Sequence, residues 1–312
     1  MKNPSGEQKG WILRGIDLSL VEGERLALVG ESGCGKSMTA LSILNLIPKP
    51  PMERTEGRIF FKGRELNTLE EKDWREIRGK EIGMIFQEPL TSLNPVIPVG
   101  KQLAETLEVH LGLPGDQIDE KVYSLLNEVG LPDPERIERQ YPHQLSGGMC
   151  QRIMIAMAVA CGPSLLIADE PTTALDVTVQ TQVLELLFRM TAEHRLAVLF
   201  ITHDLRIVKG HADRVAILYL GQVVEEGAPS ELFEHPQHPY TEGLLASLPG
   251  FSRRGRELLN IPGVVPTPFE PITGCAFADR CSRAGDRCRK EEPALNEIIK
   301  GHKVRCFYPS KK

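Results

Sequence analysis

The chain has 312 residues, of which 41% are hydrophobic and 25% are charged, and these values are ordinary for a soluble globular protein. The formal net charge of −5 argues against nucleic acid as the main partner. The start, MKNPSGEQKG, lacks the apolar core of a secretory signal, and the longest apolar run, residues 153–160, is far shorter than the roughly 20 residues that span a bilayer. We therefore predict a cytosolic chain that reaches a membrane only through partners.

Short apolar runs alternate with helical stretches as far as Gly227. Apolar runs at residues 25–30, 82–86, 165–168 and 197–201 predict buried strands. Helical spacing is found at residues 36–47, 121–129, 148–160 and 177–190. This alternation predicts an α/β fold with a mainly parallel sheet.

The segment GESGCGKS, residues 30–37, fits the pattern G-x-x-x-x-G-K-S and lies between a predicted strand and a predicted helix, as that motif requires. Its glycines allow backbone N–H groups to turn inward around phosphate oxygens, and the helix N-terminus adds a favourable dipole. Lys36 is expected to reach the β- and γ-phosphates of a nucleotide, and Ser37 to ligate Mg²⁺. The predicted nucleotide-binding residues here are Gly30, Glu31, Ser32, Gly33, Cys34, Gly35, Lys36, Ser37 and Met38.

Two acids end the apolar run LLIADEP at residues 165–171. Acids at a strand end are often only solvated, but the phosphate-binding loop upstream favours a catalytic role. Asp169 is expected to hold Mg²⁺, directly or through water. Glu170 is expected to act as the general base that polarises the attacking water.

Further segments extend this pattern along the chain. LSGGMCQR, residues 145–152, places a serine and two glycines at a helix N-terminus, which is a second anion-binding device. Gln87 follows a predicted strand, within reach of the metal and the water. His203 ends another strand, and a lone histidine in such a place is more often structural than catalytic.

From about residue 15 to residue 227 the chain resembles the ATP-binding subunits of ABC transporters, because GESGCGKS, Gln87, LSGGMCQR, LLIADEP, TALD and His203 occur in the order and spacing of that family. The resemblance implies a P-loop NTPase cassette with a RecA-like core, a small antiparallel β part and an α-helical subdomain at about residues 88–160. It implies ATP and Mg²⁺ as cofactors. It also implies ATP hydrolysis, with Glu170, His203 and Gln87 as catalytic residues and with Ser37, Gln87 and Asp169 around Mg²⁺.

In that family two cassettes form a head-to-tail dimer that encloses each ATP between them. The resemblance implies that Ser146, Gly147 and Gly148 contact the γ-phosphate of the ATP bound by the partner, and that Asp176 crosses the interface. His203 is expected to sense or stabilise the γ-phosphate and the attacking water. Closure on ATP would be transmitted to membrane subunits through the Gln87 region.

The family also carries an aromatic residue that stacks on adenine, about 30 residues before the lysine of its phosphate-binding loop. That position falls near Glu7, in the polar leader, and Trp11 is the nearest aromatic residue. Packing and adenine stacking are equally compatible with Trp11. Two hypotheses stay open: Trp11 replaces the family's residue, or the chain begins late.

Beyond Gly227 the sequence becomes proline-rich and weakly periodic, and we place a domain boundary near Gly250. It separates a cassette, residues 1–250, from a short irregular extension, residues 251–312. The histidines of EHPQHPYTEGLLASLP, residues 234–249, are flanked by prolines and make poor metal ligands.

This histidine segment instead resembles the HPYT segment of oligopeptide and dipeptide importer ATPases, as do QEPLTSLNP at residues 87–95 and IPGVVP at residues 261–266. The resemblance implies a subunit that powers di- or oligopeptide import from the cytoplasmic face of the plasma membrane. It also implies a second ATPase subunit, two transmembrane permease subunits and an extracytoplasmic peptide-binding protein. The alternatives are import of nickel or a glycoside, and a non-transport ATPase. A single cassette with no long coiled-coil insertion counts against the non-transport reading.

Four cysteines of the extension follow the spacing C-x5-C-x6-C-x17-C. Disulfides are disfavoured in the cytosol, and structural zinc usually uses tighter C-x2–4-C pairs, whereas iron–sulfur ligation tolerates varied loops, so the spacing itself leaves both an iron–sulfur cluster and zinc open. The resemblance to importer ATPases implies a 4Fe–4S cluster held by Cys275, Cys281, Cys288 and Cys306. Cys34, Cys150 and Cys161 are expected to pack as small hydrophobic side chains.

Overall fold

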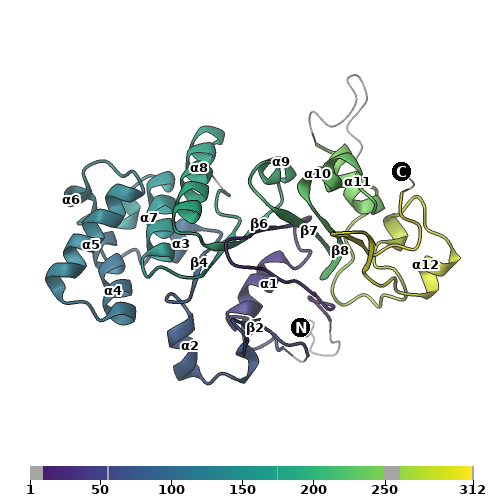
Figure 1. Cartoon of the computed structure of the whole chain (residues 1–312), viewed down its shortest axis with the longest axis horizontal. Helices are drawn as coiled ribbons and strands as arrows, with labels where there is room; N and C mark the ends of the chain where they lie inside the picture. Colours follow the sequence, from purple (N-terminus) through teal and green to yellow (C-terminus); the bar gives the residue numbers. More distant parts are fainter. Residues whose placement is uncertain (1–9, 55, 174, 249–260, 311–312) are drawn as a thin grey trace. The chain divides into compact units, whose positions relative to one another are not determined.

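The computed structural model describes residues 10–54, 56–173, 175–248 and 261–310. The chain forms two compact units (Figure 1). The first unit comprises Met1–Ser19, Arg25–Ile59 and Thr202–Lys312, and the second comprises Leu20–Glu24 and Phe60–Ile201. Each unit is described by itself below.

Three parallel strands lie at the centre of the second unit, in the order β4 (Ile82–Ile85), β5 (Leu165–Asp169) and β6 (Ala197–Thr202). Their residues are almost wholly buried, as expected of parallel strands that are covered on both faces. Gly83 of β4 is needed for this packing, because a Cβ atom there would lie 2.1 Å from the carbonyl oxygen of Ala158. A bare backbone therefore lets a helix approach the sheet closely.

Helices form the larger part of the second unit (Figure 1). They are α2 (Glu71–Ile77), α3 (Pro89–Ser92), α4 (Val99–Leu111), α5 (Gly115–Glu128), α6 (Pro134–Ile137), α7 (Gly147–Val159) and α8 (Val177–Glu193). Helix α7 packs against α3, α4, α5, α8 and strand β4, and most of its residues are buried. A two-stranded antiparallel pair, β2 (Phe60–Phe61) with β3 (Arg64–Glu65), completes the unit.

The first unit contains β1 (Arg25–Val29), which is parallel to β7 (Arg214–Tyr219), and then an antiparallel series. Strand β7 pairs with β8 (Gln222–Gly227), β8 with β10 (His302–Val304), and β10 with β9 (Asn296–Ile299). Leu220 and Gly221 form the two-residue turn between β7 and β8, both with positive φ, as a hairpin of this kind requires. The predicted α/β cassette, with a parallel core and an antiparallel part, is confirmed.

The helices of the first unit are short: α1 (Lys36–Ile43), α9 (Leu205–Val208), α10 (Pro229–Glu234), α11 (Pro239–Ala246) and α12 (Asp286–Lys290), with a 3₁₀ turn η3 (Ala278–Arg280). The extension is more regular than its sequence predicts, because β9 and β10 continue the antiparallel series. The predicted boundary near Gly250 lies in residues 249–260, outside the described residues, and stays a prediction. Among the described helices, none combines the length and the apolar character needed to cross a membrane.

Candidate functional site

The phosphate-binding loop connects the buried strand β1 to helix α1, which begins at Lys36. Gly33 and Gly35 have φ values of 79° and 107°, a region that only glycine adopts without strain. A Cβ atom at Gly30 would lie 2.3 Å from the carbonyl oxygen of Leu218, so the turn leaves no room for a side chain. The loop therefore has the backbone that the sequence motif requires.

Lys36 is buried at the base of this loop, with 4% of its surface exposed. Its ammonium group donates hydrogen bonds to the carbonyl oxygens of Gly30, at 2.9 Å, and of Glu31, at 3.1 Å. Cys34 lies beside it and is also buried, and burial raises the pKa of its thiol. Lys36 is thus bonded to the backbone of the loop, while Cys34 packs as a small apolar side chain, as predicted.

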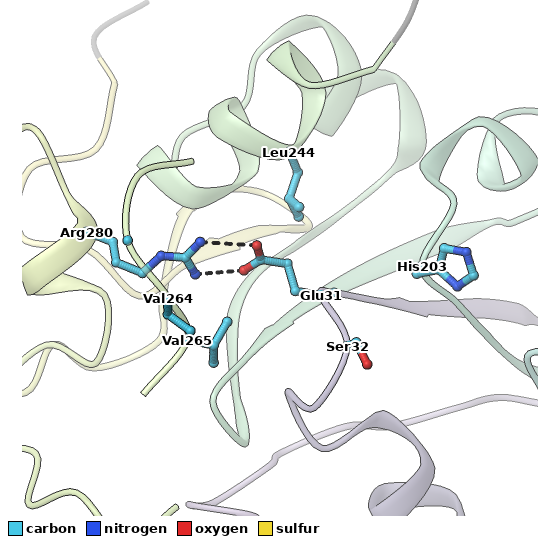
Figure 2. A pocket seen from close by; sticks show the side chains of 9 residues that line it. Glu31, Ser32, His203, Leu244, Val264, Val265 and Arg280 are labelled. Atoms are coloured by element: carbon cyan, nitrogen blue, oxygen red, sulfur yellow. Dashed lines mark hydrogen bonds and ion pairs between the residues drawn. The ribbon is translucent and has the colours of Figure 1, made fainter. Parts of the chain in front are cut away.

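Glu31 turns its side chain away from Ser32 and towards Arg280 of the extension (Figure 2). Two hydrogen bonds of 2.7 and 3.1 Å join this carboxylate to the guanidinium group of Arg280. The backbone N–H of Glu31 donates to the hydroxyl oxygen of Tyr240 at 2.9 Å. Glu31, Arg280 and His203 line one pocket, which has a volume of about 460 Å³. The first unit thus brings together the loop, His203, Arg280 and Tyr240, and the sequence analysis did not place the last two at this site.

The second unit carries the predicted catalytic acids at the end of β5. Asp169 is buried, and Glu170 follows it with a φ of 45°, which is unusual for a residue with a side chain and is the kind of strain that gathers at active sites. The Glu170 carboxylate accepts hydrogen bonds from the hydroxyl group of Thr173 at 3.1 Å and from the side-chain amide of Gln87 at 3.4 Å. Gln87 and Glu170 are therefore brought together, as the sequence predicts.

The segment of Ser146 begins helix α7. The Ser146 hydroxyl group caps this helix by accepting a hydrogen bond from the N–H of Met149 at 3.3 Å. Gly147 lies beside the Leu175 side chain, and a Cβ atom at Gly148 would lie 2.6 Å from a methyl group of Val179. This pair of glycines thus lets the start of α7 pack closely against the start of α8.

Asp176 caps helix α8 in the same way. One of its carboxylate oxygens accepts hydrogen bonds from the N–H groups of Thr178 and Val179, at 3.1 and 3.0 Å. The predicted site residues are consequently divided between the units. Gly30 to Met38 and His203 belong to the first unit, whereas Gln87, Asp169, Glu170, Asp176 and the start of α7 belong to the second.

The HPYT segment has a structural role in the first unit. The buried carboxylate of Glu225 accepts hydrogen bonds from the backbone N–H groups of Gln237 and His238 and pairs with the His302 ring at 2.7 Å. The His238 ring accepts the N–H of Tyr240 and so caps α11, and complete burial lowers the pKa of His238 to about 4. These contacts hold helix α11 in place. Tyr240 of this helix accepts the hydrogen bond from the backbone N–H of Glu31.

Trp11 is 53% exposed, and its backbone N–H donates to the carbonyl oxygen of Pro268 at 3.1 Å. The neighbouring Leu13 reaches the phosphate-binding loop, since a Cβ atom at Gly35 would lie 2.9 Å from its methyl group. The segment of Trp11 therefore passes beside the loop. The family's adenine position near Glu7 lies outside the described residues.

The four cysteines of the extension lie within electrostatic range of one another. The N–H of Cys275 donates to the carbonyl oxygen of Cys288 at 2.7 Å, an approach that needs the bare backbone of Gly274. Burial, and then the other three thiols, raises the pKa of Cys275 to about 11. The pKa values of Cys281 and Cys306 are also raised, because the effect of burial exceeds the opposing effect of the Arg283 charge.

No cluster of three or more cysteine, histidine or acidic side chains in the described part of the chain is arranged to hold a metal ion. A tetrahedral zinc ion with bonds of about 2.3 Å would require its sulfur ligands to lie within about 4 Å of one another. The four thiols thus interact electrostatically, but in the described residues they do not form a group that could hold a metal ion.

Comparison with known proteins gives two family matches. The sequence model described as "ABC transporter" matches residues 13–173, and the one described as "Oligopeptide/dipeptide transporter, C-terminal region" matches residues 224–288. The first match spans the phosphate-binding loop, the start of α7 and the acids of β5. The second spans the HPYT segment, Arg280 and the first three cysteines of the extension.

Curated relatives match almost the whole chain. A protein of Sinorhizobium fredii, named as a probable peptide ABC transporter ATP-binding protein, is 50% identical over 95% of this chain and 88% of its own length. The dipeptide transport ATP-binding protein DppD of Escherichia coli is 48% identical over 94% of this chain and 90% of its own. A solved cassette, the dimeric MJ0796 bound to ADP and phosphate, has a TM-score of 0.64 and 29% identity over 72% of this chain and 93% of its own.

Proposed function

Because the chain belongs to the ABC transporter family, we propose that it is the ATP-hydrolysing subunit of a membrane importer for di- or oligopeptides. The observation that carries the proposal is the pairing of a phosphate-binding loop with an extension that matches the oligopeptide/dipeptide transporter C-terminal region. Two relatives of similar length, from Escherichia coli and Bacillus subtilis, are named for dipeptide and oligopeptide transport.

We propose a division of roles around Mg·ATP to which each unit contributes residues. Residues 30–38 would wrap the phosphates, Lys36 would exchange its bonds to loop carbonyls for bonds to phosphate, and Ser37, Asp169 and Gln87 would hold Mg²⁺. When bound, the ion neutralises the charge of the phosphates. Glu170, held by Thr173 and Gln87, takes the proton of the attacking water.

The remaining roles concern the partner cassette. His203 contacts the γ-phosphate, while Ser146, Gly147 and Gly148 reach the nucleotide of a partner and Asp176 crosses between the two. The dimeric state of MJ0796 supports this arrangement. We infer that the partner is a second, related ATPase subunit.

We further propose that this pair binds two permease subunits at the cytoplasmic face of the plasma membrane and works with an extracytoplasmic peptide-binding protein, and not with nucleic acid. Purification from membranes through a tag on this chain should therefore yield a second cassette and two permeases. The purified complex in liposomes should hydrolyse ATP faster when a peptide-loaded binding protein is added. Stimulation by a nickel- or glycoside-binding protein instead would contradict the peptide assignment.

We also propose that Cys275, Cys281, Cys288 and Cys306 hold a 4Fe–4S cluster that folds the extension. The support is the electrostatic interaction of four thiols, one buried and three half-buried, together with the positive charge of Arg283, which acts on two of them. Such a cluster with four thiolates carries a net charge of about −2, which a nearby cation stabilises.

Anaerobically purified full-length protein is accordingly expected to be brown and to contain about four irons and four sulfides per chain. Cys281→Ser should remove the colour and most of the iron, whereas Cys161→Ser, a half-buried cysteine outside the group, should leave both unchanged. A colourless protein with one zinc ion per chain would overturn the cluster.

A further inference from the structure

The start of the phosphate-binding loop is held by a residue of the cysteine-bearing segment. Arg280 closes the turn η3, directly before Cys281, and its guanidinium group meets the Glu31 carboxylate in a bidentate ion pair of 2.7 and 3.1 Å. The Arg280 side chain is 5% exposed and the Glu31 side chain is 29% exposed. Since the arginine is nearly desolvated and the geometry is bidentate, removing Arg280 would leave a partly buried carboxylate without its partner.

Arg280 is itself rigidly placed. Its Nε–H donates to the carbonyl oxygen of Pro262 at 2.9 Å. Its guanidinium group lies 5.7 Å from the centre of the Tyr219 ring and 5.9 Å from that of Phe277. The two rings pack edge to face, 5.2 Å apart, so the cation lies over a fixed aromatic surface. The hydrogen bond to Glu31 raises the pKa of Arg280, which therefore stays charged.

Glu31 is consequently held at three points. Its N–H is bonded to Tyr240, its carboxylate to Arg280, and its carbonyl oxygen to the ammonium group of Lys36 at 3.1 Å. Two of these contacts come from outside the loop, from α11 and from the extension. One of the three contacts that hold Glu31 therefore comes from the extension.

We propose that Arg280 promotes nucleotide binding by pairing with the Glu31 carboxylate and so neutralising its charge at the start of the loop. Without Arg280 the loop that binds the phosphates would carry an unpaired carboxylate, whose negative charge opposes binding of the nucleotide. The proposal rests on the assignment of residues 30–37 to the nucleotide phosphates. It gives the cysteine-bearing segment a direct effect on ATP affinity.

The test measures the dissociation constants of Mg·ATP for the full-length protein by calorimetry. Arg280→Met should weaken binding about tenfold, because it leaves in the loop an unpaired charge of the same sign as the phosphates. Arg280→Lys keeps the charge and should lose at most about threefold. The matched control is Arg289→Met, because Arg289 pairs with Asp279 on the surface, with side chains 59% and 85% exposed, and this variant should bind like the wild type.

The decisive variant is the double change Arg280→Met with Glu31→Gln. If the unpaired charge is responsible, removing it should restore affinity to within about threefold of the wild type. If Arg280 only supports the fold of the extension, the double variant will bind as weakly as Arg280→Met, and this result would overturn the proposal. Normal binding by Arg280→Met would overturn it as well.

Lys36→Ala tests the nucleotide site itself, on which the proposal rests. Normal ATP binding by that variant would overturn the assignment of residues 30–37 to the phosphates. If Arg280→Met does not fold, the same comparison is made with Arg280→Gln, alone and together with Glu31→Gln, and the same two outcomes decide.

Discussion

Glu170→Gln is expected to slow ATP hydrolysis by about 10²–10⁴-fold, because removal of a general base typically has an effect of this size. The substitution preserves the shape of the side chain, and the new amide oxygen can still accept the hydrogen bonds of Thr173 and Gln87. It cannot take a proton from water. Nucleotide affinity should therefore change little while the chemical step nearly stops.

The measurement is single-turnover hydrolysis by the assembled complex, since an active partner subunit would hide the loss in a steady-state assay. Glu185→Gln is a suitable control, because it makes the same chemical change on an exposed position of α8. Normal turnover by Glu170→Gln would show that another group activates the water. Loss of ATP binding would instead show that Glu170 acts on the nucleotide or its metal.

The buried parallel strands could be predicted from sequence because a strand covered on both faces reads as an unbroken apolar run. Helix α4 was missed, although Val99, Leu103 and Leu107 recur at helical spacing and are all buried. Strand β8 could not be predicted in this way. Its residues Glu225 and Glu226 are 0% and 2% exposed. Acidic residues therefore occupy buried positions at which a sequence analysis expects apolar residues.

These acids are tolerated because each has a partner from a distant part of the chain. Glu225 pairs with His302, and Glu226 pairs with Arg214 and Lys303. Buried charged side chains are tolerated only when such partners are present, and no local sequence pattern predicts which distant residues the partners are.

The same reason explains which site residues were found. The phosphate-binding loop is a local motif, whereas the pair of Arg280 and Glu31 joins positions 249 residues apart, with no spacing rule between them.

Ser146→Arg is expected to prevent ATP-driven association with the partner cassette while leaving ATP binding by the isolated subunit nearly unchanged. If Ser146 reaches a nucleotide held by the partner, a long cationic side chain at this place obstructs closure. The substitution also removes the hydroxyl group that caps α7, which costs only about 1 kcal/mol. Ser146→Ala removes the cap without adding bulk, and Ser146→Thr retains it.

The association is best measured by light scattering, with Mg·ATP and the partner subunit present. All compared proteins, with Ser146 or with a substitution there, also carry Glu170→Gln so that ATP persists. Ser146→Thr and Ser146→Ala should then associate and Ser146→Arg should not. Because the cap is lost in both the alanine and the arginine variants, a difference between them isolates the obstruction from helix stability. Loss of ATP binding by the isolated Ser146→Arg subunit would place Ser146 in its own nucleotide pocket and contradict the proposed exchange between cassettes.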